Sequence, residues 1–431
     1  AERGIESMAT TKFPKPASEA LEVFPEVFHD GVTYAGPLGA AWAPGRVNII
    51  GEHTDYNDGF VLPAAVDRVA SFAGRARSDQ TVRLWSTHFQ EQAHFSLEGL
   101  PDTFDQQRAN LPGWARYILG VVSELIRDGA QLRGFDAVVG GDVPLGSGMS
   151  SSASLEVGTA GACSFFSDGK FTIGDKGATM TPMQVAQACQ RAEHAASGLR
   201  SGILDQAASV LGRPGKAVLL DCRSYEYRYI PFEAPDISLV VIDTNVRREL
   251  ASSAYNERRQ QCEEATKLLR EAIVQHEPDK AQAPQIKALR DISPEQFQRY
   301  RHHLPEILRK RAGYIIAENE RVFQAAAALE RGDVEAVGPI LWLGHEGLRD
   351  EYEVSCPELD VLVEIAHQVE GVLGARMIGG GFGGCTITLL RNEAIENLRQ
   401  AVEKFYPERT GRQATIDICR AAGGPGHATV D

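Results

Sequence analysis

The chain has 431 residues, 43% of them hydrophobic, and its 58 acidic and 44 basic residues give a net charge of −14. This length favours two domains, each with a core of its own. The negative charge argues against binding to nucleic acid or to anionic membranes. No apolar run reaches about eighteen residues, so no membrane span is expected.

The seven cysteines are odd in number and lie far apart, without a C-x-x-C pair. Such spacing favours free thiols in a reducing compartment over disulfides or a zinc site. The first residues of the sequence also contain no apolar segment like the core of a signal peptide. We therefore expect a cytoplasmic protein.

The first half of the chain mixes predicted helices and strands, and the second half is heavier in Glu, Arg and Gln. Periodicity and composition predict helices at residues 17–27, 114–128, 150–166, 182–196, 203–211, 252–276, 294–331 and 357–369. Strands are predicted between residues 39 and 95, at 135–139, 238–244 and 385–390, and as a pair within 216–232. The change in composition predicts a boundary near residue 233, between domains at 20–233 and 234–431.

Residues 43–60, APGRVNIIGEHTDYNDGF, concentrate polar groups directly after apolar sequence. The alternation with apolar residues, broken by glycines, predicts a strand that runs into a tight turn. Such a turn brings several side chains to one place. Carboxylates, an imidazole and a guanidinium together suit a ligand with many hydroxyl groups, such as a sugar. A single residue here is compatible with a plain acidic loop, but the run as a whole indicates a site.

Residues 141–157, GDVPLGSGMSSSASLEV, predict a strand, a loop rich in glycine and serine, and then a helix. The free N–H groups and the dipole of a helix N-terminus attract anions, and glycines let the backbone approach a phosphate closely. The serine hydroxyls add donors or a magnesium ligand. The loop is not a Walker motif, because no G-K-[ST] follows, and it is not a dinucleotide fingerprint.

Residues 374–390, GARMIGGGFGGCTITLL, contain a formal G-x-G-x-x-G at Gly379, Gly381 and Gly384. A dinucleotide fingerprint must open a helix, whereas a strand is predicted to follow here. This segment is therefore expected to be a glycine-rich turn between two strands.

Asp205 and the histidines are further candidates for functional residues. Asp205, in SGILDQAASVLG, begins a predicted helix and could be a plain helix-end charge favoured by the dipole. The eleven histidines form no H-E-x-x-H motif, and His302, His303 and His345 are expected on helix surfaces.

The motif at residues 43–60 closely resembles the galactokinase signature, and the other two motifs resemble blocks of the same family in the same order, so that the resemblance spans residues 38–390. The family belongs to the small-molecule kinase superfamily that includes homoserine, mevalonate and phosphomevalonate kinases. The resemblance implies an α+β fold of two domains. The N-terminal domain would pair a mixed sheet with helices (ribosomal S5 domain 2-like), the C-terminal domain would be a ferredoxin-like split βαβ, and the active site would lie in the cleft between them.

By that resemblance the functional residues can be assigned. Catalysis would fall to Asp205 and Arg46. Galactose would be bound by Arg46, Glu52, His53, Asp55, Gly202, Asp205 and Tyr255. ATP would be bound by Gly146, Ser147, Gly148, Ser150, Ser151, Ser152 and Trp114, with Tyr117 also near the adenine. Magnesium would be held by Ser152 and Glu193.

The implied activity is phosphorylation of the C1 hydroxyl of α-D-galactose by Mg-ATP, which is the first step of galactose catabolism. The implied partners are galactose and Mg-ATP, and the protein would be a monomer. Two alternatives stay open: a kinase for N-acetylgalactosamine, and a non-catalytic sensor of galactose and ATP. The intact serines at residues 150–152 and the intact Asp205 favour catalysis. Ile49, Ser147 and Met149 depart from the family pattern.

Overall fold

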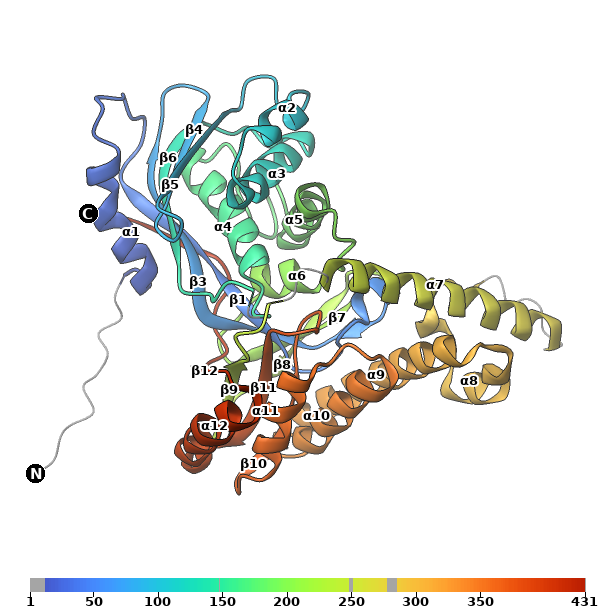
Figure 1. The fold of residues 1–431 in the computed structure, drawn as a ribbon. Coiled ribbons are helices and arrows are strands. Elements are labelled where there is room, and N and C mark those ends of the chain that lie inside the picture. The colour runs from blue at the N-terminus through green and yellow to red at the C-terminus, as the bar shows by residue number, and fades with distance from the viewer. Residues whose placement is uncertain (1–11, 147, 248–250, 277–284, 431) are drawn as a thin grey trace, which may run out of the picture.

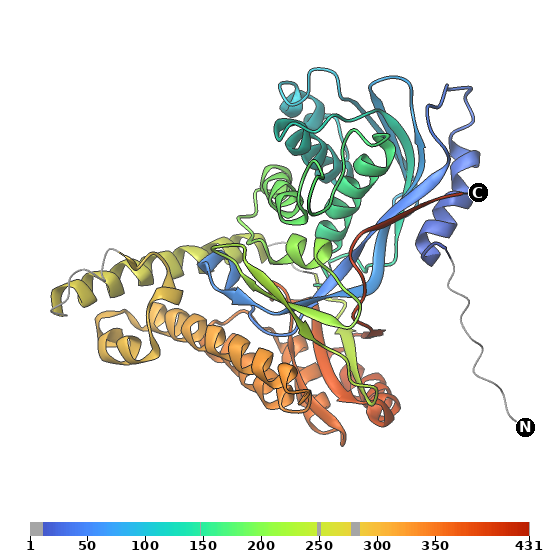
Figure 2. The ribbon, with the colours of Figure 1, turned by 180° about the vertical axis from the view of Figure 1, so that it is seen from behind.

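The structure is a computed structural model that describes residues 12–146, 148–247, 251–276 and 285–430. Within these ranges the chain forms three sheets of six, four and three strands, flanked by helices (Figure 1, Figure 2). The resulting α+β architecture is the one expected from the sequence. In the same ranges, none of the helices is both long enough and apolar enough to cross a membrane.

The six-stranded sheet has the order β13-β1-β3-β6-β4-β5 and is mixed, because β4 and β6 run parallel while the other pairs are antiparallel. Its strands are β1 (Gly39–Asn48), β3 (Pro63–Ala76), β4 (Thr81–Ser86), β5 (Glu91–Ser96), β6 (Phe135–Gly141) and β13 (Gly426–Thr429). This confirms the mixed sheet predicted for the first part of the chain.

Helices cover both faces of this sheet (Figure 1). Helix α1 (Lys15–Val27) packs on one face, and α4 (Ser151–Phe166) packs on the other. Alternate residues of a strand point to opposite faces, so that Phe72 joins the core beneath α4 while Ala73 joins the core beneath α1. The layer around α4 is completed by α2 (Phe104–Ala109), α3 (Gly113–Arg127), α5 (Pro182–Ser197) and α6 (Leu204–Val210).

The four-stranded sheet is antiparallel and has the order β10-β11-β9-β12. Along the chain, helices separate β9 from β10, and one helix separates β11 from β12, which gives the predicted split βαβ arrangement. The strands and covering helices are β9 (Ile237–Asp243), α10 (Val337–Glu346), α11 (Pro357–His367), β10 (Val372–Met377), β11 (Cys385–Arg391), α12 (Ile395–Thr410) and β12 (Thr415–Cys419).

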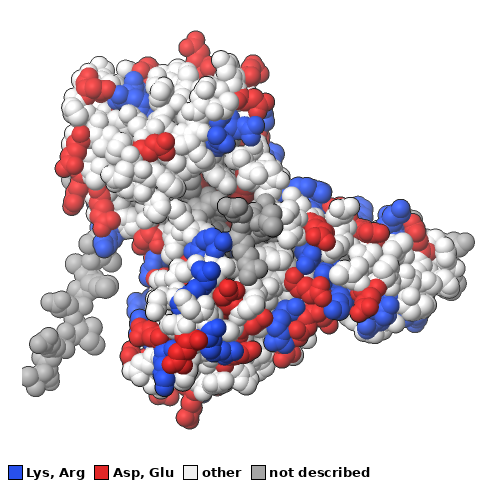
Figure 3. Space-filling model, viewed as in Figure 1, with Lys and Arg blue, Asp and Glu red and all other residues white. Residues whose placement is uncertain are grey.

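The three-stranded sheet and a helical arm complete the fold. The sheet contains β2 (Phe60–Val61), β7 (Lys216–Asp221) and β8 (Tyr227–Pro231). The arm contains α7 (Ala251–His276), α8 (Pro294–Tyr300) and α9 (Glu306–Glu330), and α7 lies beside α9 in both ribbon views. Acidic and basic side chains alternate over its surface (Figure 3). The helix pattern predicted across residues 294–331 is interrupted at Pro305, which precedes α9 and has no N–H to donate.

The two halves of the chain share a core. Val240 of β9 packs with α11 and α12, whereas its neighbour Val241 packs with Val47 and Ile49 from the end of β1. The end of the chain also returns to the first half, because β13 pairs with β1. The predicted boundary near residue 233 stays a prediction.

Candidate functional site

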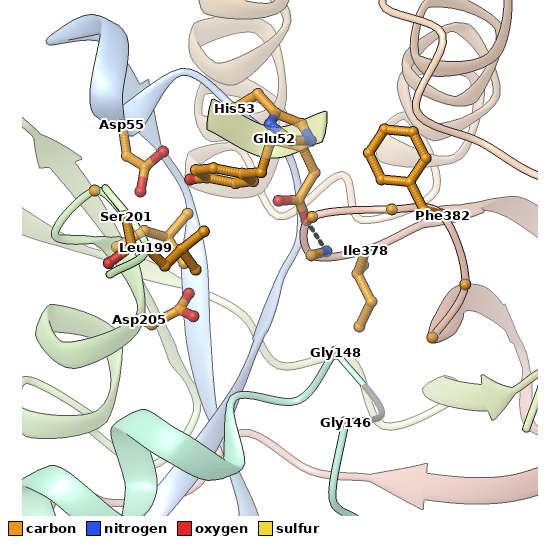
Figure 4. A pocket seen from close by; sticks show the side chains of 18 of the residues that line it. Glu52, His53, Asp55, Gly146, Gly148, Leu199, Ser201, Asp205, Ile378 and Phe382 are labelled. Carbon is orange, nitrogen blue, oxygen red and sulfur yellow. Dashed lines mark hydrogen bonds between the residues drawn. The ribbon is translucent and has the colours of Figure 1, made fainter. Parts of the chain in front are cut away.

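A cavity of about 460 Å³ lies between the end of β1, the loop before α4, the start of α6 and the turn between β10 and β11 (Figure 4). In Figure 4, Asp55 and Asp205 enter the same space from opposite sides. The lining residues that the sequence predicted as site residues are Arg46, Glu52, His53, Asp55, Gly146, Gly148, Glu193, Gly202, Asp205 and Tyr255.

The turn after β1 is held tightly, as the sequence predicted. Gly51 has a φ of +99°, and a Cβ there would lie 2.7 Å from the Phe60 carbonyl oxygen. The Gly51 N–H donates to Glu318 of α9 at 2.9 Å, and the Thr54 hydroxyl donates to the Gly51 carbonyl at 2.8 Å. These bonds fix the direction of the polar side chains that follow Gly51.

Glu52 is tied to the glycine-rich turn. Its Oε1 accepts hydrogen bonds from the Gly379 N–H at 3.1 Å and from Arg376 at 3.2 Å. Arg376 is completely buried and also donates to the Asn48 and Ile49 carbonyls. Burial raises the pKa of Glu52, although the charges of Arg376 and Arg46 act against this rise.

His53 and Asp55 have strongly shifted pKa values. Burial, aided by the charges of Arg258 and Arg376, lowers the pKa of His53 to about 3, so its ring is neutral near pH 7. Burial and the Asp205 carboxylate raise the pKa of Asp55 to about 7. One acid of the cavity is therefore poised to titrate near neutral pH.

Asp205, on the first turn of α6, is oriented by two neighbours. Its Oδ1 accepts from Arg46 Nε at 2.8 Å, and its Oδ2 accepts from the Ser150 hydroxyl at 2.5 Å. The Arg46 side chain is almost fully buried, whereas 30% of the Asp205 side chain is exposed. Gly202 packs directly against Asp55, because a Cβ on Gly202 would lie 2.0 Å from the Asp55 Oδ2. The Asp205 carboxylate is thus fixed by its neighbours and partly open to a ligand.

The loop before α4 has the backbone expected of an anion-binding turn. Gly146, Gly148 and Ser150 have positive φ values, and α4 begins at the next residue. Arg46 donates to the Gly148 carbonyl, and Arg247 donates to the Leu145 carbonyl at 3.1 Å, so two guanidinium groups flank the loop. Ser147 lies outside the described residues. Ser151 and Ser152 form the first turn of α4.

Glu193 of α5 faces this first turn. Its carboxylate accepts from the Ser152 hydroxyl at 3.1 Å, from the Ser201 hydroxyl at 2.5 Å and from Gln206 at 3.1 Å. Burial raises its pKa. The part of the chain that the structure describes has no group of three His, Cys, Asp or Glu side chains that could hold a metal. The hydroxyl and carboxylate of this pair still suit a cation that takes one or two protein ligands and otherwise binds phosphate and water, as Mg²⁺ does.

A second cavity, of about 360 Å³, meets the first at Gly146. Trp114, Tyr117, Phe89 and Leu145 line it, together with Ser151 and Ser152. The Trp114 and Phe89 rings stack, with centroids 6.4 Å apart and an interplanar angle of 13°. This largely apolar space is lined by two stacked aromatic rings, adjoins the serine-rich loop and has the character of a nucleobase site.

Sequence reasoning missed several residues that the fold brings to the site. They are Ser201, Gln206, Arg247, Glu318 and Arg376. Gln206 directly follows Asp205, and Arg247 is eight residues before Tyr255, so adjacency to a site residue was an available signal for both. Arg376 lies within the glycine-rich segment 374–390, so it had the same signal, although nothing local indicates its pairing with Glu52. Nothing local indicates Glu318.

The expectation for His345 was wrong. His302 and His303 are exposed, as predicted. His345 is only 2% exposed, and its ring bonds to the Asp360 carboxylate at 3.1 Å and accepts from the Met377 N–H at 3.3 Å. The helix that carries it, α10, is packed against β10, which leaves no solvent on that side.

The comparison with known families agrees with this geometry. Residues 23–76 match the galactokinase galactose-binding signature, residues 116–213 match the N-terminal domain of GHMP kinases, and residues 325–408 match their C-terminal domain.

Proteins that are similar to this chain over nearly its full length are also galactokinases or related kinases. The galactokinase of Roseiflexus sp. (strain RS-1) is 42% identical over 89% of this chain and 91% of its own length. The human galactokinase is 41% identical over 97% of this chain and 98% of its own length. The crystal structure of Lactococcus lactis galactokinase complexed with galactose superposes with a TM-score of 0.82 at 33% identity, covering 94% of this chain and 98% of that one. Methanococcus jannaschii mevalonate kinase, at 18% identity and a TM-score of 0.58, shares the fold. On these similarities and on the geometry of the cavity, the chain belongs to the galactokinase family of the GHMP kinases.

Proposed function

We infer that this protein transfers the γ-phosphoryl group of ATP to the C1 hydroxyl of α-D-galactose, giving galactose 1-phosphate and ADP. The observation that carries this proposal is the position of Asp205, which is fixed by Arg46 and Ser150 between a polar turn and a glycine- and serine-rich loop. A sugar hydroxyl and a terminal phosphate would meet at this carboxylate.

The sugar would be bound by the turn after β1 and by the segments opposite it. Glu52, Asp55 and Asp205 are acceptors for hydroxyl groups, and Arg46 is a donor. The Tyr255 ring lines the cavity, with its centroid 5.3 Å from that of the His53 ring. Because a site built to pair hydroxyl groups is left with buried unpaired groups when one is misplaced, these contacts would discriminate between epimers.

The nucleotide would lie across the two joined cavities. Its base would stack near Trp114 and Tyr117, and its phosphates would follow the loop from Gly146 to the first turn of α4. The N–H groups of that turn, Arg46 and Arg247 supply the positive field that phosphate requires.

Ser152 and Glu193 would hold the Mg²⁺ of Mg-ATP, since their oxygen atoms lie 3.1 Å apart beside the loop. A bound Mg²⁺ supplies neutralisation of the phosphate charge. The Ser201 hydroxyl and Gln206 keep the Glu193 carboxylate turned toward Ser152.

Asp205 would accept the proton of the C1 hydroxyl and orient that oxygen toward the γ-phosphate. Phosphoryl transfer passes through a loose transition state, so positioning and charge matter more than the strength of the base. The contact between Ser150 and Asp205 is intact, which favours an enzyme over the sensor alternative. We further propose that the protein acts as a monomer in the cytoplasm, where its seven buried cysteines would stay reduced.

The test is release of ADP from Mg-ATP with galactose, glucose, N-acetylgalactosamine and arabinose as acceptors. We expect rapid release with galactose and none with glucose. Turnover of N-acetylgalactosamine in preference to galactose would replace the proposed substrate. Binding of galactose without release of ADP would overturn the proposed activity.

A further inference from the structure

A buried chain of hydrogen bonds runs from His53 away from the sugar cavity. His53 Nδ1 lies 2.7 Å from the Tyr56 hydroxyl, which lies 2.7 Å from the Tyr352 hydroxyl, which in turn lies 3.2 Å from the Cys262 thiol. All four side chains are at most 9% exposed. The chain joins the turn after β1 to α7 and to the segment between α10 and α11.

The other ring nitrogen of His53, Nε2, has different surroundings. Nε2 is buried and makes no hydrogen bond of ordinary geometry to a described residue, although the Gly380 backbone lies beside the ring and acts to raise the pKa of His53. The neutral ring carries a single N–H, which is either on Nδ1 or on Nε2. Each choice fixes the direction of every bond in the chain, because each tyrosine hydroxyl donates only once.

The two directions are not equivalent. If Nδ1 accepts, the Tyr56 O–H donates to a good acceptor, the Tyr352 O–H donates to Tyr56, and the thiol donates to Tyr352. If Nδ1 donates, the direction is reversed and a tyrosine O–H ends on sulfur. The sulfur contact is weak in both directions, because a thiol is a weak donor and a weak acceptor. The His53 end decides, because a phenol O–H is a stronger donor than an imidazole N–H and an imidazole nitrogen is a stronger acceptor than a phenol oxygen. The first direction is therefore favoured.

We propose that Tyr56, supported by Tyr352 and Cys262, fixes the tautomer of His53 with its proton on Nε2, at the wall of the sugar cavity. This inference rests on the proposed galactose site. Tyr56 is the positioning residue that acts through His53, whereas Tyr352 contacts only the Tyr56 hydroxyl. The effect is to give a single, fixed N–H to the His53 ring, which lines the cavity together with the acceptors Glu52 and Asp55.

The direct test is NMR of the ring nitrogens in the full-length protein with ¹⁵N-labelled histidine and without substrates. The chain has 11 histidines, and the signal lost in His53→Gln identifies the ring. We expect the proton on Nε2 and an unprotonated Nδ1. A proton on Nδ1, or on both nitrogens, would overturn the inference.

Two variants test which residue sets the tautomer. Tyr56→Phe removes the donor to Nδ1, so we expect a mixture of tautomers. The galactose KM should rise about tenfold, whereas kcat and the ATP KM should each stay within about twofold of the original values. Tyr352→Phe is the matched control, because the Tyr56 O–H can still donate to Nδ1 and the Nε2 tautomer should persist. An unchanged tautomer in Tyr56→Phe would refute the role of Tyr56. If galactose gives no release of ADP, the proposed substrate fails while the NMR result stands by itself.

Discussion

Asp205 is the residue on which the proposed chemistry depends most. Asp205→Ala removes the acceptor for the C1 proton and leaves Arg46 without its carboxylate partner. Because base catalysis contributes about 10²–10⁴-fold, we expect kcat to fall by about that factor while galactose binding survives in part. Steady-state kinetics and titration calorimetry measure the two effects. The matched control is Asp105→Ala, which removes an exposed carboxylate from the first turn of α2 and should be silent. A near-normal kcat in Asp205→Ala would reject the assignment.

Asp55 gives galactose binding a predicted pH dependence. Its pKa is raised to about 7, and an ionised carboxylate accepts hydroxyl hydrogen bonds more strongly than a protonated one. The galactose Kd should therefore fall as the pH rises from 6 to 8, by up to about tenfold per pH unit below 7. Calorimetric titration at several pH values measures this. In Asp55→Asn the profile should be flat and binding weak throughout, and a slope that persists would assign the titration to another group.

The same pKa shift predicts that ionisation of Asp55 makes the folded protein less stable, although it strengthens galactose binding. The unfolded Asp55 ionises near pH 3.9, but the folded one near 7, so between these values the folded state binds more protons and stability falls as pH rises. Asp55→Asn should therefore raise the free energy of unfolding at pH 8, on the order of 1–3 kcal/mol, and change it little at pH 4. Urea denaturation at both pH values is the measurement. Equal changes at both would exclude ionisation as the cause.

The loop that precedes α6 sets the shape of the sugar cavity. A Cβ on Gly202 would lie 2.0 Å from Asp55 Oδ2, so Gly202→Ala must displace that carboxylate. A displacement of about 1 Å can cost about 10²-fold, and we expect the galactose KM to rise on that scale while the ATP KM changes little. Gly113→Ala is the control, because a Cβ on Gly113 meets nothing within 4 Å. Equal effects on both substrates would show that the loop supports the whole fold rather than the sugar contacts.

At this scale the sequence predicts what is local. Periodicity placed α3, α4, α5 and α6 and the strands on both sides of the glycine-rich turn, because their patterns depend on neighbours in the chain. It did not place His345 in the interior, since a polar residue on an apolar helix becomes buried only through packing on β10. The break before α9 depends on Pro305, which a periodicity count passes over.

At the scale of the molecule, the site is made by segments that are remote in sequence. The three motifs predicted contacts within the turn, the loop and the glycine-rich segment, and these meet in one cavity. The groups that lock them together could not be predicted, because Glu318 is 267 residues from Gly51 and Arg376 is 324 residues from Glu52. No periodic pattern carries pairings at such separations. The family resemblance predicted that the three motifs contribute to one active site, but not the pairings of Glu318 and Arg376 that hold them together.

Arg376 is the clearest link between the two halves, because it extends from β10 to Glu52 and to two carbonyls at the end of β1. Its side chain is completely buried and that of Glu52 is 5% exposed, so Arg376→Met leaves a buried carboxylate without its ion-pair partner. We expect a loss of about 3–5 kcal/mol in the free energy of unfolding, measured by urea denaturation.

The control and the double variant determine the origin of that loss. Arg391→Met breaks a half-exposed pair with Glu335 and should cost less than about 1 kcal/mol. Adding Glu52→Gln to Arg376→Met should recover part of the loss, because the unpaired charge is then removed. Strictly additive losses would mean that Arg376 acts through its carbonyl contacts alone. Recovery would mean that the carboxylate proposed to bind the sugar is held in the fold by a charge from the opposite half of the chain, so that stability and substrate recognition depend on the same buried pair.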